Sequence, residues 1–571
     1  MHSVTTQDLF KFGFAKRDIT PPPRGEMLFG YVDPNHRAHA VSMPLNARAV
    51  VIEAPGARAV AVVCLEICSV AQAVRDAVLD RVRKEFPDWS EDDLVVCATH
   101  THCAPGGHYH DVLYSIASLG WYPHVLERYA EGAAEAVIAA SRAMKPGRIR
   151  FAEGKIADEK PVAFNRSISA WNMNPDVTKF TFKERNRALD RVMRHYRFED
   201  ENGGFVGCVN DFAVHCTSMH RDQKVIHADN KGVAADLMEK EAGGVCLFIQ
   251  GAAGDVSPNF QRFKGLVETR GTNRDDLIST YDNGRIQADV AKTLNEDAKA
   301  SSPLEAYVKT MIEYVDLSRV EVDPRDVGGK TDCRTGPAVI GARAILGTDE
   351  GMPTPKIMFY LANVVSKVSD VLAWVRPKRN GSPVYLFGRD PIQGPKIGCI
   401  QSGYSEVFRS AAIHRIIFPD FVDPLIGKLK SWARKNITSR RPLTPQIVPI
   451  QLVQLGRAVW IIVPAEFTTM SGIRLKQSVL ADYAGEANAA TQAMLIGYAN
   501  SYSGYVTTPE EYQRQLYEGA STHFGQWTQP AYQTLFRRMV LALGSTAARP
   551  VALVPSRPTA EELEWMRAAE L

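Results

Sequence analysis

The chain has 571 residues and a mass of 63.1 kDa, with 45% hydrophobic and 23% charged residues. This composition is typical of a globular protein with roughly two to four domain-sized cores, and it excludes disordered, collagen-like and disulfide-scaffold classes. The 67 basic and 64 acidic residues leave a net charge of +3, so no nucleic-acid partner is expected. Because no run of about 18 apolar residues occurs, we also expect no transmembrane segment.

Cysteine usage and the first residues bear on the cellular compartment. The start of the chain has no basic segment followed by an apolar segment, the pattern of a secretory signal. Nine cysteines are an odd number, and several lie in apolar, strand-like runs, which favours free thiols in a reducing compartment. We therefore predict a cytoplasmic protein, and a processed secreted form is the alternative.

Apolar periodicity predicts alternating strands and helices through most of the chain. In chain order we expect strands at 48–53, 58–66 and 94–99, helices at 74–86 and 125–137, a strand at 205–215, a helix at 233–241, strands at 245–250, 447–455 and 458–464, a helix at 471–480 and a strand at 493–499. This rhythm predicts an α/β fold, a large layered domain with a mixed or parallel sheet. Reactive groups in such folds lie beyond the carboxyl ends of the strands.

The stretch 319–441 is rich in Pro, Gly and basic residues, and we interpret it as an insertion or lid on the core domain. Within it, apolar residues between Met358 and Val375 predict an amphipathic helix that either packs on the core or contacts lipid. The run from Lys428 to Arg441 has six basic and no acidic residues, and it is either a solvated face or a site of peripheral membrane contact.

Histidines follow two of the predicted strands. His100 and His102 come directly after the strand at 94–99, and extended geometry would put both rings on one side of the chain. Two such imidazoles can bind a metal ion, or one can bind while the other transfers protons; a hydrogen-bonded structural pair is the alternative. His215 ends the strand at 205–215, and Asp229 either caps the next helix or fixes the tautomer of a ligand.

Three further strands lead into polar turns. Ser257 follows the strand at 245–250 as a candidate nucleophile or substrate-holding hydroxyl, although Val256 and Pro258 exclude a Gly-x-Ser-x-Gly elbow. Glu466 follows the strand at 458–464, where a carboxylate needs either a cation or helix N–H donors. The phenol-rich segment 500–522, which includes Tyr505, predicts a lined pocket. We expect these groups to converge on one site with His100 and His215.

Together these segments resemble the neutral, non-lysosomal ceramidase family. The matching blocks are DITP at 18–21, THTHCAPGG at 99–107, FNRS at 164–167, FAVHCTSM at 212–219, ADNKG at 228–232, GDVSPN at 254–259, VPAEFTTMSG at 463–472 and NSYSGYVTTPEEYQRQLYEGAST at 500–522. They extend over almost the whole chain. The resemblance implies a zinc-dependent amidase that splits the N-acyl bond of ceramide into sphingosine and a fatty acid.

Carried over by position, the resemblance implies specific roles. Zinc would be held by His100, His215, Glu466 and Tyr505, and His102, Arg166, Ser257 and Tyr517 would surround the scissile amide. A metal-activated water would attack, with Ser257 and Tyr517 as hydrogen-bond donors and His102 assisting proton transfer. A covalent acyl-Ser257 route is the alternative.

The sequence departs from the family pattern in places. It ends about 50 residues after the last block, without the usual immunoglobulin-like domain, and it lacks the cysteine-rich sequence after GDVSPN. We therefore predict one catalytic domain at 1–545, with a variable insertion or lid at 319–441 and a tail at 546–571. We expect a small-molecule or lipid amide substrate. The alternatives are the same zinc site acting on a non-lipid amide, carbamate or ester, and a non-catalytic lipid-binding protein.

Overall fold

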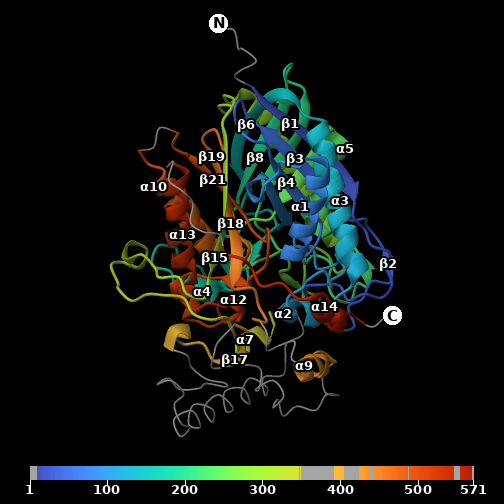
Figure 1. Cartoon of the computed structure of the whole chain (residues 1–571), viewed down its shortest axis with the longest axis vertical. Helices are drawn as coiled ribbons and strands as arrows, with labels where there is room; N and C mark the ends of the chain where they lie inside the picture. The colour runs from blue at the N-terminus through green and yellow to red at the C-terminus, as the bar shows by residue number, and fades with distance from the viewer. Residues whose placement is uncertain are drawn as a thin grey trace.

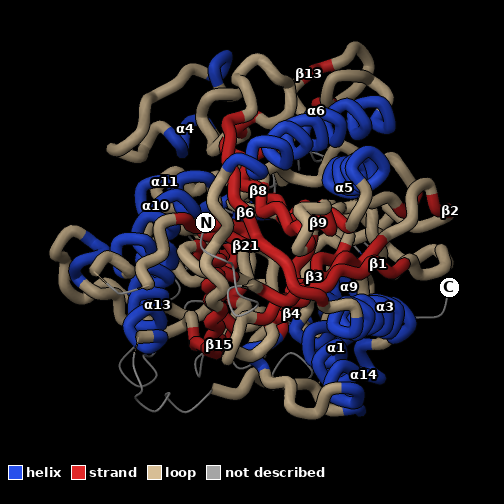
Figure 2. The backbone as a smooth tube through the Cα atoms, turned by 90° about the horizontal axis from the view of Figure 1, so that it is seen from above, coloured by secondary structure: helices blue, strands red, loops and turns tan. Residues whose placement is uncertain are grey.

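Two β-sheets packed face to face form the centre of the molecule in the computed structural model, which describes residues 9–345, 347–348, 391–403, 424–435, 441–485, 488–544 and 553–568. Helices cover the outer face of each sheet, so the chain forms four layers, helix, sheet, sheet and helix (Figures 1 and 2). The predicted layered α/β class with mixed sheets is confirmed.

The larger sheet has eight strands in the order β11-β9-β8-β6-β1-β3-β4-β5. They are β1 (Phe10–Asp18), β3 (Asn46–Glu53), β4 (Val60–Leu65), β5 (Leu94–Ala98), β6 (Lys145–Lys155), β8 (Val192–Asp200), β9 (Phe205–Asp211) and β11 (Val245–Ile249). The pairs β4–β5 and β9–β11 are parallel and the others antiparallel. Parallel pairing brings the carboxyl ends of neighbouring strands to one edge of the sheet.

The smaller sheet has the order β15-β18-β19-β21, with strands Val308–Asp316, Ile447–Leu455, Ala458–Ile462 and Gln492–Ile496. Its last pair, β19–β21, is parallel. Apolar side chains of both sheets interdigitate between them, including Phe12 and Val62 from the larger sheet and Trp460 from the smaller one. Strands buried on both faces explain the almost continuous apolar runs in the sequence.

The helices pack by apolar stripes on the outer faces. The larger sheet is covered by α1 (Gln72–Glu85), α3 (Pro123–Arg142), α5 (Asp229–Ala242) and α6 (Asp276–Asp297), and the smaller one by α10 (Thr469–Asp482) and α13 (Thr528–Leu543). In α1, Val74, Val78 and Val82 recur every four residues and are fully buried, as expected for an amphipathic helix. Pro123 begins α3, where its missing N–H costs no intrahelical hydrogen bond.

Short segments complete the end of the sandwich. They are β2 (Ala40–Val41) with β10 (Val225–Ile226), β7 (Phe164–Asn165) with β12 (Val256–Ser257), β13 (Gln261–Arg262) with β14 (Thr269–Arg270), β20 (Glu466–Phe467) with β22 (Tyr505–Val506), and helices α2 (Val112–Ile116), α4 (Ile168–Trp171), α11 (Pro509–Tyr512) and α12 (Tyr517–Ser521). One predicted boundary is wrong: the strand at 205–215 ends at Asp211, because the chain then leaves the sheet, and the backbone N–H of His215 donates to the carbonyl of Val256 instead.

Only parts of the predicted insertion are described. They include β16 (Val339–Gly341), β17 (Gly398–Gln401), α7 (Ala342–Ile345) and α9 (Pro424–Arg434). Lys396 is fully buried and donates to the backbone of Val339 and Thr522, so this part packs on the core. The amphipathic helix expected at 358–375 lies outside the described residues. The lid and the boundaries of the domain stay predictions.

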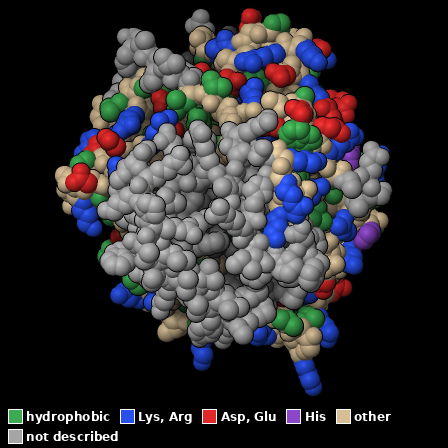
Figure 3. Space-filling view, turned by 60° about the horizontal axis from the view of Figure 1, so that its bottom comes forward, with side chains coloured by type: hydrophobic (Ala, Val, Ile, Leu, Met, Phe, Trp, Pro, Cys, Tyr) green, Lys and Arg blue, Asp and Glu red, His purple; other side chains and the backbone are tan. Residues whose placement is uncertain are grey.

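The basic run and the predicted tail both reach the lower end of the molecule in Figure 1. Arg434 and Lys435 are exposed, but Arg441 is 6% exposed, so the run is not entirely a solvated face. In Figure 3, which turns this end forward, Lys and Arg side chains are prominent among the exposed coloured groups. In the tail, α14 (Ala560–Met566) buries Met566 against Val112 and Trp432.

Two sequence expectations concern the membrane and the thiols. None of the helices in the described ranges is long and apolar enough to cross a membrane. The eight cysteines whose side chains the structure describes are all buried and free.

Candidate functional site

The candidate site lies between the two sheets, where strand ends from both of them meet. His100, His215 and Ser257 follow β5, β9 and β11 of the larger sheet, and Ser257 itself lies in the short strand β12. Glu466 follows β19, and Tyr498 and Tyr502 follow β21, from the smaller sheet. The predicted convergence of groups beyond the carboxyl ends of strands is therefore observed.

His100 and His102 face each other, but not for the predicted reason. β5 ends at Ala98, and His100 has a φ of 76°, in the left-handed region that is uncommon for a non-glycine residue. This turn, rather than strand alternation, brings the two Nε2 atoms within 3.2 Å. Gly30 makes room for His102, since a Cβ at position 30 would lie 2.3 Å from the imidazole ring.

The tautomers of the two buried imidazoles are fixed by main-chain carbonyls. The Nδ1 of His100 donates to the carbonyl of Cys68 at 2.6 Å, and the Nδ1 of His215 donates to that of Ala253 at 2.6 Å. Both Nε2 atoms therefore carry lone pairs, and both point toward Glu466. The distances to Glu466 Oε2 are 3.6 Å from His100 and 3.4 Å from His215.

Two phenols hold the Glu466 carboxylate. The hydroxyl of Tyr498 donates to Oε2 at 3.2 Å, and the hydroxyl of Tyr502 donates to Oε1. Tyr498 also packs its ring against His100, with centroids 4.1 Å apart. Sequence reasoning gave neither tyrosine a role, although both belong to or adjoin the phenol-rich segment that it identified as a lined pocket.

Burial keeps His100 and His102 neutral. It lowers the pKa of His100 to about 4, against the opposing attraction of Glu466, and it lowers the pKa of His102 well below its usual value. Burial alone would raise the pKa of Glu466, but its electrostatic interactions with His100 and His215 and the hydrogen bond from the Tyr502 hydroxyl outweigh burial and bring this pKa to about 2. At neutral pH His100 and His102 are thus neutral imidazoles beside the Glu466 carboxylate anion.

This donor set fits a zinc ion. Three buried side chains offer two nitrogen atoms and one oxygen atom, all within 4.8 Å of one another. The Nε2 atoms and Glu466 Oε2 face each other with no proton between them, an arrangement that a cation stabilises. Imidazole and carboxylate are common zinc ligands, and second contacts to each ligand, as seen here, are typical of zinc sites.

Cys68 also lies near the histidines. Its thiol, with His100 and His102, makes a second group of potential metal ligands, and its Sγ lies 3.6 Å from the Nδ1 of His100. Since that Nδ1 donates to the Cys68 carbonyl and burial raises the thiol pKa well above its usual value, the group with Glu466 is the better metal site.

Arg166 contacts both Tyr505 and Tyr517, two of the predicted site residues. Its Nε donates to Glu518 at 2.8 Å, and one terminal nitrogen donates to the carbonyl of Gly254 at 2.7 Å and to the hydroxyl of Tyr505 at 3.2 Å. The guanidinium group also lies over the ring of Tyr517, 5.5 Å from its centroid. Sequence reasoning missed Glu518, which pairs with a residue 352 positions away.

Tyr505 and Tyr517 form the aromatic wall beside Arg166. Their ring centroids are 5.4 Å apart and nearly perpendicular, and Tyr505 on β22 is paired in register with Glu466 on β20. Burial and the charge of Glu466 raise the pKa of Tyr517 to about 12 and that of Tyr505 well above its usual value, so both stay protonated at neutral pH. Direct metal binding by Tyr505 stays a prediction.

Ser257 lies one residue beyond a backbone contact of His215. The carbonyl of Val256 accepts from the His215 backbone N–H at 3.1 Å, and Ser257 Oγ accepts from the Asn259 N–H at 2.9 Å. The side chain is 1% exposed. Ser257 is therefore linked to the cluster through the turn that contacts His215. Both predicted roles of its hydroxyl, nucleophile and hydrogen-bond donor, stay predictions.

Asp229 hydrogen-bonds to the loop after His215 rather than to a histidine ligand. Ala228, not Asp229, is the N-cap of α5, and the Asp229 carboxylate accepts backbone N–H groups of Ser218 and Met219. The tautomer of His215 is fixed by Ala253 instead. Asp229 thus stabilises the loop that follows His215.

Comparisons with known proteins find similar sequences over most of the chain. The sequence model described as "Neutral/alkaline non-lysosomal ceramidase, N-terminal" matches residues 10–380 and 432–534. A neutral ceramidase of Pseudomonas aeruginosa is 30% identical over 540 residues, which cover 94% of this chain and 72% of that protein. A neutral ceramidase of Mycobacterium tuberculosis is 29% identical, over 97% of this chain and 79% of that protein.

Solved structures are similar over the same extent. The crystal structure of the neutral ceramidase from Pseudomonas aeruginosa superposes with a TM-score of 0.75 at 27% identity, over 97% of this chain and 77% of that chain. A ceramidase complexed with C2 superposes with a TM-score of 0.76 at 27% identity, over 96% of this chain and 78% of that chain.

Proposed function

The chain belongs to the neutral/alkaline non-lysosomal ceramidase family, and on this premise we propose that it hydrolyses the N-acyl amide bond of ceramide or a closely related lipid amide in a zinc-dependent reaction. The observation that carries the proposal is the convergence of His100, His215 and Glu466, with both imidazole lone pairs directed at the carboxylate. The products are a fatty acid and a long-chain amine.

His100, His215 and Glu466 would hold the zinc ion, and Tyr505 is the proposed fourth protein ligand. When bound, zinc lowers the pKa of a coordinated water and polarises a carbonyl group, which supplies the nucleophile and an electrophilic centre at neutral pH. The residues of the chain bind and orient the amide around that centre.

His102 is suited to proton transfer. It is neutral because burial lowers its pKa, its Nε2 lies beside His100, and its ring is held by Gly30 and Tyr31. Hydrolysis adds the elements of water across the C–N bond, so the departing nitrogen needs a proton and the acyl carbon gains oxygen. We propose that His102 accepts a proton from the attacking water and returns it to the amine nitrogen.

The other side of the site would stabilise negative charge on the acyl oxygen. Tyr517 is protonated and lies beside the Arg166 cation, so it can donate a hydrogen bond to that oxygen. Ser257 has the same capacity. In the alternative route its Oγ would attack the acyl carbon, the C–N bond would break, the serine proton would pass to the departing amine, and water would then hydrolyse the acyl-serine ester. Arg166 is held by Glu518 and Gly254 and fixes the orientation of the Tyr505 hydroxyl.

The experiment combines metal analysis with a substrate panel. We expect about one zinc ion per chain and hydrolysis of a short-chain fluorescent ceramide, both lost in His100→Ala. Simple anilide, ester and carbamate substrates form the second arm. Turnover of these alone would contradict ceramide as the substrate, and undiminished turnover by the variant would contradict the metal mechanism. Binding of ceramide without turnover of any substrate would indicate a lipid-binding protein.

A cytoplasmic location stays a prediction, supported by the eight cysteines whose side chains the structure describes, all of them free and buried. Fractionation of cells that produce the full-length natural protein tests it.

A further inference from the structure

Large apolar side chains are exposed on three segments next to the site. They are Val32 (46% exposed), Val267 (68%), Leu277 (49%), Ile278 (46%) and Tyr281 (49%). Val32 also has a φ of 53°, which is strained for a β-branched residue and marks a loop tip held by its surroundings. Single exposed apolar residues are common on protein surfaces, but a cluster of them indicates an interaction site.

Each segment connects directly to a residue of the candidate site. Tyr31, next to Val32, packs its ring edge-on against His102 with centroids 4.7 Å apart. The hairpin β13–β14, which carries Val267, begins four residues after Ser257. Asp276, next to Leu277, accepts the backbone N–H of His220, five residues after His215. The exposed side chains therefore lie on segments that are linked to the site through Tyr31, Ser257 and His220.

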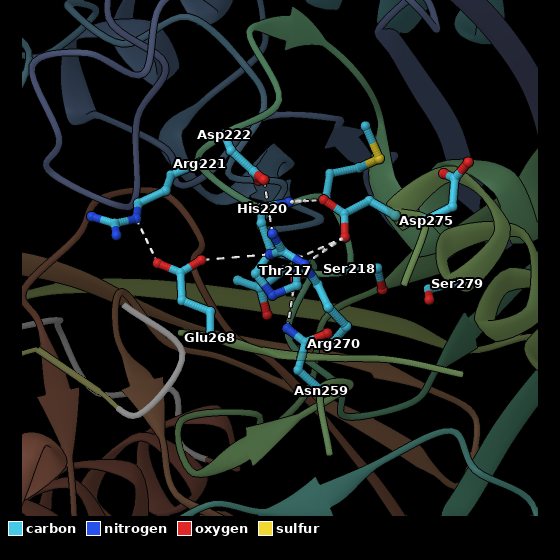
Figure 4. A network of polar contacts seen from close by, with 12 residues as sticks. Thr217, Ser218, His220, Arg221, Asp222, Asn259, Glu268, Arg270, Asp275 and Ser279 are labelled. Carbon is cyan, nitrogen blue, oxygen red and sulfur yellow. Dashed lines mark hydrogen bonds and ion pairs between the residues drawn. The ribbon is translucent and has the colours of Figure 1, made fainter. Parts of the chain in front are cut away.

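Buried ion pairs join the three segments, as Figure 4 shows around Glu268 and Arg270. Arg221 contacts Asp33 at 3.4 Å and Glu268 at 2.6 Å. Arg270 contacts Glu268 at 3.5 Å and Asp276 at 3.3 Å. Glu268, Arg270 and Asp276 are each at most 6% exposed. A buried network of this kind fixes the loop at 30–33, the hairpin and the start of α6 as one rigid unit.

The exposed charges on the hairpin and the following turn are mainly positive. Arg262, Lys264 and Arg274 are exposed and form no ion pair with any residue of the described ranges. The acidic residues Glu268 and Asp276 are buried against Arg221 and Arg270. Asp275 is the exposed acidic residue of this stretch, and it caps α6 by accepting from Leu277 N–H. The surface thus combines apolar groups with unpaired basic groups.

We propose that these side chains form a docking rim that rests on an anionic lipid bilayer and turns the active site toward it. The docking rim consists of Val32, Arg262, Lys264, Val267, Arg274, Leu277, Ile278 and Tyr281. Apolar groups that enter the interface beside basic groups that attract anionic headgroups are the recognised combination for reversible membrane binding. The proposal rests on the proposed function, since a lipid amide resides in a bilayer.

The test uses the full-length chain and vesicles of stated composition. Wild type and the double variant Val267→Glu, Leu277→Glu are sedimented with phosphatidylcholine vesicles and with vesicles in which about a third of the lipid is phosphatidylglycerol. We expect wild type to bind the anionic vesicles, more weakly as salt is raised, and the variant to bind at least about tenfold less. Leu541→Glu, at a 59% exposed position of α13, is the matched control and should bind like wild type.

Turnover separates docking from catalysis. We expect the double variant to hydrolyse vesicle-embedded ceramide about tenfold more slowly than wild type, and a detergent-soluble short-chain ceramide at the wild-type rate. Equal vesicle binding by wild type and the double variant overturns the proposal, and so does an equal loss in Leu541→Glu. A concentration-dependent dimer that the double variant abolishes also overturns it, since the rim would then bind a second copy. Failure of the proposed function would look different: vesicle binding without hydrolysis of either ceramide form.

Discussion

The two sheets hold the residues of the candidate metal site by different means. On the side of the larger sheet, His100 and His215 are oriented by main-chain carbonyls of Cys68 and Ala253. On the side of the smaller sheet, Glu466 is oriented by hydroxyl groups of Tyr498 and Tyr502. A main-chain acceptor cannot be removed by a point substitution, whereas a hydroxyl can. The orientation of the two imidazoles is therefore insensitive to substitution of the residues that accept their hydrogen bonds. The orientation of the carboxylate can be changed by substituting Tyr498 or Tyr502.

The largest effect is expected when either side loses its ligand. His215→Ala and Glu466→Ala should each lower activity by at least about 10³-fold and abolish stoichiometric metal binding, because three protein ligands are the usual minimum for a catalytic zinc. Metal analysis with steady-state kinetics checks this. His124→Ala, a half-buried histidine paired with Glu26 outside the site, is the control and should retain metal and activity. Full metal content in either ligand variant would contradict the assigned site.

The next effect concerns the residue that joins the two sides. Arg166→Met removes the cation beside Glu518, a buried carboxylate that, among the described residues, would keep only the hydrogen bond from the Ser167 hydroxyl, so the free energy of unfolding should fall by about 3 kcal/mol. Activity should fall by about 10²-fold, because Tyr505 and Tyr517 lose their neighbour. Urea unfolding and kcat measurements check both. Arg185→Met, which removes a cation stacked on exposed Phe182, should change neither by much.

A smaller effect, on zinc affinity, tests whether a hydroxyl group orients the Glu466 carboxylate. Tyr502→Phe should weaken zinc affinity by about 10- to 100-fold, because the Glu466 carboxylate loses one orienting donor. Competition with a chelator measures the affinity. Tyr114 packs against Tyr502, with ring centroids 5.0 Å apart, and its buried hydroxyl has no partner among the described residues. Tyr114→Phe should therefore leave the affinity unchanged, and an equal loss in both variants would refute the orienting role.

The smallest effect concerns stability at the junction of the two sides. Burial and neighbouring Asp255 raise the pKa of Glu511 to about 7, so the folded protein holds a proton that the unfolded chain releases above its ordinary pKa of 4.5. Stability from this group is complete below pH 4.5 and is lost as pH rises toward 7. Relative to wild type, Glu511→Gln should gain about 1–2 kcal/mol between pH 4.5 and 7.5. Urea unfolding at both pH values checks this, and a pH-independent difference would contradict it.

Sequence reasoning was most successful where chemistry follows a strand. His100, His215 and Glu466 could be predicted because apolar runs define the strands, and strand ends converge in layered α/β folds. The geometry at His100 could not, because a left-handed residue within a His-x-His pattern has no sequence signature. The pattern correctly predicted that His100 and His102 lie side by side, but it did so by assuming an extended backbone that the structure does not have.

Long-range partners were the main gap. Arg166 and Glu518 are 352 residues apart, and no periodicity links them. Tyr498 and Tyr502 could not be distinguished from other phenols of the segment that follows β21, since only the fold decides which hydroxyl reaches Glu466. Asp229 was expected near a ligand because it follows the His215 strand. Its carboxylate instead accepts hydrogen bonds from backbone N–H groups of the loop between His215 and Asp229.

The free cysteines of the larger sheet make its opening measurable. Cys64 is paired in register with Cys97 across β4–β5, and Cys246 with Cys208 across β9–β11, and each is at most 3% exposed. A thiol reagent can reach these sulfur atoms only when the sheet separates, because apolar side chains cover both of its faces. The labelling rate of each pair therefore reports the free energy of opening of one edge of the sheet. Two cysteine pairs thus report on the strands that lead to His100 and His215, because Cys97 lies in β5 and Cys208 lies in β9.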